Sequence, residues 1–349
     1  MSSWNASCGV STHAELIGDA LLRKGFDLTV FAPRQYIDDS THLTNTPDEH
    51  YVKRVYDFLR YGDNYIDLNV LQSTYLDSKR ILDTDFDLLL IEKPTSVPLP
   101  KLKKTLPKIM EKAKVIGIMH EGLPILNPFF KKIDWDALII FDDRFRKFLP
   151  SKWEDKIHTV PFPCYPLKPR DTAKKQVTDF EKLQILSYNK VHDLQQVLRG
   201  IEKAQKEIGT IEYKLLLGRI EGYEQVKKYQ DKYPFLKLSV TRPSNSKLRN
   251  ILSESDVILF NNRQPNHIAL SSSVHFCLST MTLIFGNNVR YFDMFNGEMI
   301  KYSDSDVLSE KLVNLNHFGA NEVLQKAEEF CKKYSSDKIT EQILEIAFN

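Results

Sequence analysis

The stretch from Asn266 to Asn287 holds the residue types best suited to bind a charged ligand. It reads NHIALSSSVHFCLSTMTLIFGN, so that Ser271, Ser272 and Ser273 precede an apolar segment and then an expected strand. Small hydroxyl residues before a helix leave backbone N–H groups exposed at its positive end, which suits a phosphate. We therefore expect a ligand here. The alternative is that the serines only cap the helix.

Two histidines flank these serines. His267 and His275 stand eight positions apart, so a continuous helix would separate them by about 80°. If a loop carries the first and an initial helical turn carries the second, the pair could bracket one ligand. Taken by themselves, the two residues favour the alternative that both are surface or satisfied core histidines.

Length and charge limit the classes of protein. A chain of 349 residues and 40.5 kDa exceeds one ordinary core and indicates two domains of roughly 160 to 180 residues each. The 48 Lys and Arg against 46 Asp and Glu give a net charge of +2, which makes no global case for nucleic-acid binding.

Cysteine usage and the N-terminus favour a cytoplasmic protein. The four cysteines share no metal-ligand spacing, which is typical of a reducing compartment: they are Cys8, Cys164, Cys277 and Cys331. The first residues lack a basic segment followed by an apolar run, and no stretch reaches the roughly 18 apolar residues that span a bilayer. A lysine-rich amphipathic helix expected over 100–113 leaves peripheral membrane contact open; a solvated surface is the default.

Alternating helices and strands must position these residues. Thr12 and Glu15 form a T-x-x-E capping box that predicts a helix ending near Gly25, and DLTVFAP follows as a strand. A βαβ unit would have a further strand before Ser2, so the first strand is apparently missing. Continuous apolar runs then predict buried parallel strands at 86–94, 114–122 and 136–143.

Ligands of such sheets collect at the carboxyl ends of the strands. His120 and Glu121 sit at one such end, so we expect His120 to face a ligand; the alternative is a core or capping histidine. Lys93 ends another strand, and we expect it to be a solvated lysine.

The second half of the chain repeats the alternation. A segment at 164–176 is rich in proline and charge, has no periodicity and reads as a linker. Strand and helix patterns then alternate over 177–334, and a last helix follows at 335–349. The sequence thus predicts an α/β protein of two Rossmann-like, doubly wound domains.

Three stretches, in their order along the chain, resemble glycosyltransferases with the GT-B fold, and specifically glycosyltransferase family 4. They are CGVSTHAELIGDALLRKGFDLTVFAP (8–33), DALIIFDDRFRKFL with KIHTVPFP (136–163) and AEEFCKKYSSDKITEQILEI (327–346). The resemblance implies two domains facing across a cleft. It also implies a nucleotide-sugar donor, transfer with retention of configuration, and no metal or cofactor.

The resemblance assigns a role to each part of the chain. Residues 1–163 would form the acceptor domain and 177–334 the nucleotide-sugar domain, and the helix at 335–349 would return to the first domain. The acceptor would be a glycan, a lipid-linked group or a protein. Asn189 and Lys190 occupy the place of a basic pair that neutralises the diphosphate, so only Lys190 supplies a full charge.

The family's Glu-x7-Glu motif is degenerate here. His267 and His275 fall on its two glutamates, which bind the donor sugar and the ribose. A carboxylate accepts hydrogen bonds from hydroxyls, whereas a neutral imidazole accepts one and donates one. Ribose binding by His275 fits this change better than the donor-sugar role of His267.

Further contacts are implied for the diphosphate, the sugar and the base. The backbone amides of Ser271 to Ser273 would face the diphosphate, and the loop of Gly9 would approach it closely, unless Gly9 is only a turn glycine. His120 would lie near the donor sugar. Arg219 sits where the family has a base-side loop.

Two observations leave a competing hypothesis open. The absence of both glutamates and of the first strand suits a catalytically inactive GT-B module that binds a nucleotide or a protein partner.

A further triplet, Asp304, Ser305 and Asp306, matches the D-x-D of metal-dependent transferases, but we expect Asp304 to be a helix cap.

Overall fold

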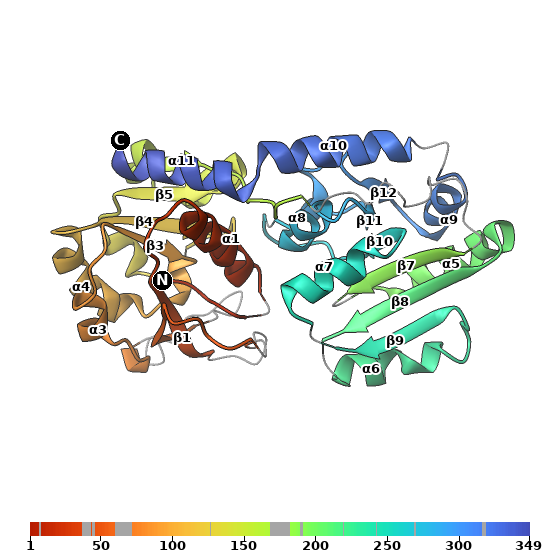
Figure 1. The fold of residues 1–349 in the computed structure, drawn as a ribbon, viewed down its shortest axis with the longest axis horizontal. Coiled ribbons are helices and arrows are strands. Elements are labelled where there is room, and N and C mark those ends of the chain that lie inside the picture. The colour runs from red at the N-terminus through yellow and green to blue at the C-terminus, as the bar shows by residue number, and fades with distance from the viewer. Residues whose placement is uncertain are drawn as a thin grey trace. The chain divides into compact units, whose positions relative to one another are not determined.

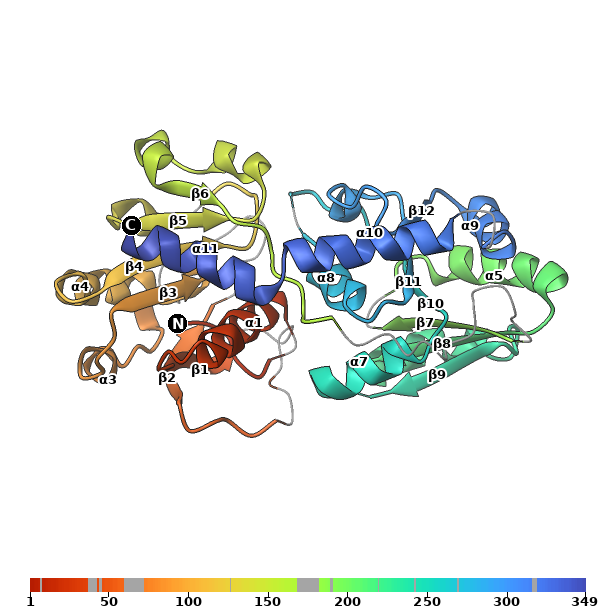
Figure 2. The same cartoon turned by 45° about the horizontal axis from the view of Figure 1, so that its top comes forward.

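The chain forms two α/β units (Figures 1 and 2). The computed structural model describes residues 1–6, 8–36, 43, 46–59, 72–125, 127–167, 182–188, 191–218, 220–241, 243–268, 270–315 and 319–349. Unit 1 comprises Met1–Pro163, His267–Ser272 and Tyr334–Asn349, and unit 2 comprises Cys164–Asn266 and Ser273–Lys333. Residues 168–176 of the expected linker lie outside the described residues, and the preceding Cys164 already belongs to unit 2.

Unit 1 is built on parallel strands that are largely buried. A two-stranded sheet pairs β1 (Val30–Tyr36) with β2 (Val52–Phe58), and a four-stranded sheet has the order β3 (Leu88–Glu92), β4 (Lys114–Met119), β5 (Ala137–Ile140), β6 (Ile157–Thr159). Its α-helices include α1 (Gly9–Arg23), α3 (Ser78–Leu82), α4 (Leu99–Met110) and α11 (Ser336–Phe348). The continuous apolar runs of β3, β4 and β5 suit strands that are covered on both faces.

The first residues of the chain connect these two sheets. The Met1 nitrogen donates to the Leu90 carbonyl at 2.6 Å, and the Met1 carbonyl accepts from the Glu92 N–H at 3.0 Å. On the other side, the Ser2 N–H donates to the Phe31 carbonyl at 3.0 Å. The first residues of the chain therefore lie between β1 and β3, although too few of them pair to form a regular strand.

Helix α1 begins earlier than the capping box predicted. Its N-cap is Cys8, whose side chain makes no capping bond, and Thr12 lies inside the first turns. Glu15 instead accepts a hydrogen bond from the Asn5 N–H at 3.1 Å, in the loop before the helix. The capping-box prediction was wrong because this carboxylate satisfies a loop amide rather than the end of a helix.

Helix α11 packs beside α1 in unit 1 (Figures 1 and 2). Arg23 donates to Asp337 at 2.8 Å and Lys24 to Glu341 at 2.5 Å. These ion pairs are largely exposed and add little stability by themselves. They do fix the position of α11 along α1.

Unit 2 is a six-stranded parallel sheet in the order β12-β11-β10-β7-β8-β9. Read from β7, this is the strand order 3-2-1-4-5-6 of a doubly wound Rossmann sheet. The strands are β7 (Leu183–Tyr188), β8 (Ile211–Leu217), β9 (Leu236–Val240), β10 (Val257–Phe260), β11 (Leu283–Asn287) and β12 (Ile300–Tyr302). The predicted α/β class with parallel sheets is confirmed.

Among the described residues, six α-helices accompany this sheet. They are α5 (Leu194–Ile208), α6 (Ile220–Val226), α7 (Asn245–Ser253), α8 (Ser272–Leu278), α9 (Ser305–Val313) and α10 (Ala320–Lys333). Short 3-10 helices lie at Pro94–Ser96, Phe130–Lys132, Asp143–Phe148, Ser151–Lys156, Lys227–Tyr229 and Arg290–Phe292. Within the described ranges, no helix is both long enough and apolar enough to cross a bilayer.

Candidate functional site

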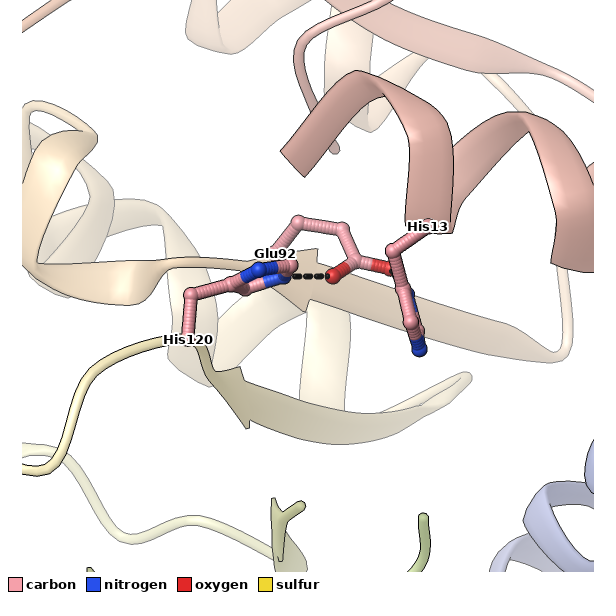
Figure 3. Close-up of side chains that lie close together, drawn as sticks. All are labelled: His13, Glu92 and His120. Carbon is pink, nitrogen blue, oxygen red and sulfur yellow. Dashed lines mark hydrogen bonds and ion pairs between the residues drawn. The ribbon is translucent and has the colours of Figure 1, made fainter. Parts of the chain in front are cut away.

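A buried carboxylate joins two histidines at the carboxyl ends of β3 and β4 (Figure 3). Glu92 is the last residue of β3, His120 follows β4, and His13 projects from α1. The Glu92 Oε1 atom lies 2.8 Å from His13 Nδ1, and its Oε2 lies 2.6 Å from His120 Nε2. The side chains of His13, Glu92 and His120 are 1%, 3% and 8% exposed. His120 is therefore held by a carboxylate at the edge where we expected a ligand.

The two imidazoles keep Glu92 ionised. Burial by itself raises the pKa of a carboxylate, but the charge and hydrogen bonds of His13 and His120 outweigh it and lower the pKa of Glu92 to about 2. Burial also lowers the pKa of His120 from 6.5, although Glu92 opposes this shift. At neutral pH we therefore expect an anionic Glu92 beside a neutral His120.

Aromatic rings surround the two histidines. The Phe141 ring centroid lies 5.0 Å from those of both His13 and His120, and the Phe162 ring lies 5.2 Å from that of His13. The His13 and His120 rings are themselves 5.4 Å apart and meet edge to face. This packing restricts the rotation of both imidazoles and keeps water from the carboxylate.

These three residues also form a donor set that could hold a transition metal. Among the described residues, one imidazole nitrogen from each histidine and one Glu92 oxygen lie within 4.8 Å of one another, and two imidazoles with a carboxylate suit Zn²⁺ or a related ion. Each carboxylate oxygen already lies at hydrogen-bond distance from one imidazole nitrogen. The geometry therefore favours a hydrogen-bonded network over a metal centre.

Lys93 and Glu121 form an ion pair next to this network. Lys93 adopts a left-handed backbone conformation (φ 48°, ψ 63°). This conformation is unfavourable for residues other than glycine, and residues that adopt it cluster at functional sites. The Lys93 Nζ lies 2.7 Å from Glu121 Oε1, and the lysine side chain is 14% exposed. The expectation of a solvated Lys93 was wrong, because a partner from the next loop draws the ammonium group inward.

His267 reaches the same region of unit 1. Burial tends to raise the pKa of Glu121, but Lys93, His267 and His120 together lower it. The neighbouring Ile268 pairs with Gly122, the residue after Glu121. The segment that carries His267 therefore lies beside the loop that carries His120 and Glu121.

A pair of backbone hydrogen bonds fixes the segment that carries His267. The Gly122 N–H donates to the Ile268 carbonyl at 2.8 Å, and the Ile268 N–H donates back at 3.1 Å. The segment His267–Ser272, with Ser271 and Ser272, therefore belongs to unit 1. A Cβ atom added to Gly9 would lie 2.8 Å from the Ser272 Oγ, so Gly9 permits the close approach of Ser272 to the start of α1.

Replacing Gly122 by alanine is expected to weaken unit 1. The new Cβ would lie 2.6 Å from Phe145 Cδ1 and 2.9 Å from Ile268 Cβ, and overpacking of this kind costs about 1–3 kcal/mol. Urea unfolding of the variant should show a lower midpoint than the wild type. Gly222→Ala is the matched control, because its Cβ would meet Leu217 Cδ2 at 3.6 Å, an ordinary contact. Equal midpoints for the two variants would contradict this account.

The remaining predicted residues fall in unit 2 or outside the described residues. His275 is 1% exposed, and its ring lies 5.1 Å from that of Phe295 and 5.8 Å from that of Phe330. This position favours the alternative of a core histidine. The Ser273 carbonyl accepts from the Tyr188 hydroxyl at 3.3 Å. Asn189, Lys190 and Arg219 lie outside the described residues.

Sequence reasoning missed His13 and Glu92. His13 lies inside the first stretch of the family resemblance (8–33), but no role was assigned to it there, and Glu92 is 79 positions away. One signal was present: Glu92 is a single acid after four apolar residues, LLLI, of a strand that reads as buried. An acid inside such a strand needs a partner, because an unpaired buried charge is costly.

The D-x-D triplet is a helix cap, as predicted. The Asp304 carboxylate accepts hydrogen bonds from the backbone N–H groups of Asp306 and Val307 at 2.9 and 3.0 Å. It therefore starts α9 in the manner of an N-cap residue.

The fold is shared with solved glycosyltransferases, whereas no protein-family model matches the chain. A glycosyltransferase from Rickettsia africae ESF-5 superposes with a TM-score of 0.65 at 12% identity, covering 97% of this chain and 94% of that one. The pneumococcal O-GlcNAc transferase GtfA, solved with UDP and GlcNAc, gives a TM-score of 0.55 at 13% identity and 77% coverage of this chain. The chain has the GT-B fold.

A third solved structure extends the comparison. Anabaena HepE, in complex with UDP-glucose, has a TM-score of 0.55 at 10% identity, with 84% of this chain and 85% of that chain covered. The chain spans just over half of two longer relatives, 57% of GtfA and 55% of TarM. At these identities the likeness establishes the fold alone.

Proposed function

We propose that this protein is a glycosyltransferase that moves a sugar from a nucleoside-diphosphate sugar to an acceptor hydroxyl. The observation that carries the proposal is the pairing of Ile268 with Gly122, which brings the segment of His267 beside His120 and Glu121 at the carboxyl end of β4, where ligands of such sheets bind. The shared fold supports it, because GtfA and HepE were solved with UDP or UDP-glucose. The acceptor would be a glycan, a lipid-linked group or a protein.

The reaction we propose retains the anomeric configuration and needs no metal. The bond between the anomeric carbon and the diphosphate oxygen breaks, and the acceptor hydroxyl attacks the same face of an oxocarbenium-like sugar. The proton of that hydroxyl passes to the departing diphosphate. Stabilising the departing diphosphate would be the largest catalytic contribution. We assign this role to Lys190 and the amides of Ser271 to Ser273, with His120 and His267 at the sugar.

Other residues complete the proposed donor site. Gly9 would let the start of α1 approach the diphosphate, and Asn189 would stand beside Lys190. Arg219 would contact the phosphate or the base. A ribose contact by His275 would require its buried ring to become accessible.

A ligand panel tests this function. UDP-, GDP-, ADP- and dTDP-sugars are added in separate thermal unfolding experiments, with the matching free sugars as controls. A true donor at a hundredfold excess over Kd should stabilise the protein by about 2.7 kcal/mol, and the same donor should be turned over with a suitable acceptor. If no nucleotide sugar shifts the transition, the proposal is wrong.

A second candidate function has its own motivation. His275 is 1% exposed, and histidines stand at both positions of the motif, which would suit a module that binds a nucleotide or a protein partner without catalysis. Stabilisation by a nucleotide sugar without turnover or hydrolysis would favour this module over the enzyme.

A further inference from the structure

We propose that Glu92 and His13 are positioning residues that fix which ring nitrogen His120 presents to a ligand. The identity of that ligand rests on the proposed function, but the positioning is a property of the free protein. It follows from the hydrogen-bonding capacity of the three side chains in Figure 3.

The first step concerns the hydrogens between the three groups. An ionised carboxylate only accepts hydrogen bonds, and each oxygen of Glu92 faces one imidazole nitrogen at 2.8 or 2.6 Å. Both nitrogens must therefore carry a hydrogen. Glu92 thus selects the Nδ1–H form at His13 and places a hydrogen on Nε2 of His120.

The second step concerns the other nitrogen of His120. A neutral imidazole has one ring hydrogen, and in His120 Glu92 holds it at Nε2. Nδ1 is then a hydrogen-bond acceptor. It suits a hydroxyl group, which donates a hydrogen bond, and it repels a phosphate oxygen, which does not.

The third step concerns rigidity. The three side chains come from α1, the end of β3 and the loop after β4, so the backbone that carries each one is fixed by the fold. The Phe141 ring contacts both imidazoles. Replacing a residue that orients a functional side chain through a hydrogen bond typically lowers activity about 10- to 100-fold.

Glu92→Gln provides a sharp test. Glutamine has nearly the same shape, but its amide offers one acceptor and one donor group. It cannot accept hydrogen bonds from two imidazoles through separate oxygens. One histidine must then move its ring hydrogen to the other nitrogen or lose its bond.

Nitrogen-15 NMR of histidine-labelled protein reads these ring hydrogens directly. The chain has nine histidines, and single His→Asn variants assign the two resonance sets. In the wild type at pH 8 we expect the Nδ1–H tautomer for His13 and the Nε2–H tautomer for His120. In Glu92→Gln, at least one of the two should change. The opposite tautomer for His120 in the wild type would overturn the proposal.

Two variants of His13 separate positioning from packing. In His13→Asn the amide nitrogen can still donate to Glu92, whereas His13→Phe keeps an aromatic ring without a donor. We expect His120 to keep a single sharp tautomer in His13→Asn and to populate both in His13→Phe. Identical spectra for the two variants would show that His13 only fills space.

Two further readouts complete the test. Added Zn²⁺ should leave the His13 and His120 resonances unchanged; stoichiometric shifts of both would identify a metal centre and overturn the proposal.

With a donor found in the ligand panel, Glu92→Gln should lower kcat about 10- to 100-fold with a smaller change in KM. Wild-type tautomers as expected, without turnover of any donor, would leave the positioning intact and contradict the enzymatic function.

Discussion

Replacing His120 by alanine is expected to lower kcat of the proposed reaction about 10²- to 10³-fold, the usual cost of removing one preorganised hydrogen-bonding group from an active site. His120 stands at the carboxyl end of β4 with one nitrogen held by Glu92, so its ring needs no reorganisation when the substrate binds. The measurement is steady-state turnover of the nucleotide sugar that stabilises the wild type. The change in KM should be smaller, because the contact strengthens as the sugar develops charge.

His158→Ala is the matched control for this experiment. His158 lies on β6 of the same unit, away from the network of His13, Glu92 and His120, and its loss should leave kcat within about twofold. Equal losses in the two variants would indicate that both act through the stability of unit 1. Unchanged turnover in His120→Ala would remove His120 from the site.

Acid is expected to destabilise the protein through Glu92. Its pKa is about 2 in the folded chain against a usual 4.5, so between these values the unfolded chain binds the extra proton. Stability is therefore fully present above pH 4.5 and lost as the pH falls toward 2, by about 3 kcal/mol over the whole window. The pKa of His120 is lowered from 6.5 in the folded chain, so the unfolded chain binds this proton first. The stability of the protein therefore also falls as the pH drops below 6.5.

The measurement is urea unfolding from pH 7 to pH 3 for the wild type and for Glu92→Gln. Other carboxyl groups titrate in both proteins, so the difference between the two curves isolates the contribution of Glu92. The stability advantage of the wild type should shrink as the pH falls below 4.5. Parallel curves would mean that the pKa of Glu92 is not lowered in the folded protein.

The ion pair of Lys93 and Glu121 shows how the fold concentrates polar groups at one edge. Both residues follow the ends of neighbouring strands. They are in contact at 2.7 Å, and Lys93 has a left-handed backbone conformation. A strained residue persists only where its surroundings determine its conformation. Its position beside Glu92 supports the assignment of this edge as the ligand-binding face.

Local patterns in the sequence determined the strands and the fold class. The apolar runs at 86–94, 114–122 and 136–143 contain β3, β4 and β5, because strands buried on both faces leave no room for polar residues. The position of His120 at a strand end follows from the same pattern. The cap formed by Asp304 was also local, since an N-cap carboxylate bonds to amides two and three residues ahead.

Tertiary structure decided the partners of these residues. His13 and Glu92 meet across 79 positions, and the segment His267–Ser272 joins unit 1 although the chain on both sides of it belongs to unit 2. No local pattern encodes such contacts, because they depend on where separate elements pack. The sequence by itself determined which residues stand at the ends of strands, and only the packed fold decided that a buried carboxylate holds one of them, since hydrogen bonds between distant side chains exist only after the elements have come together.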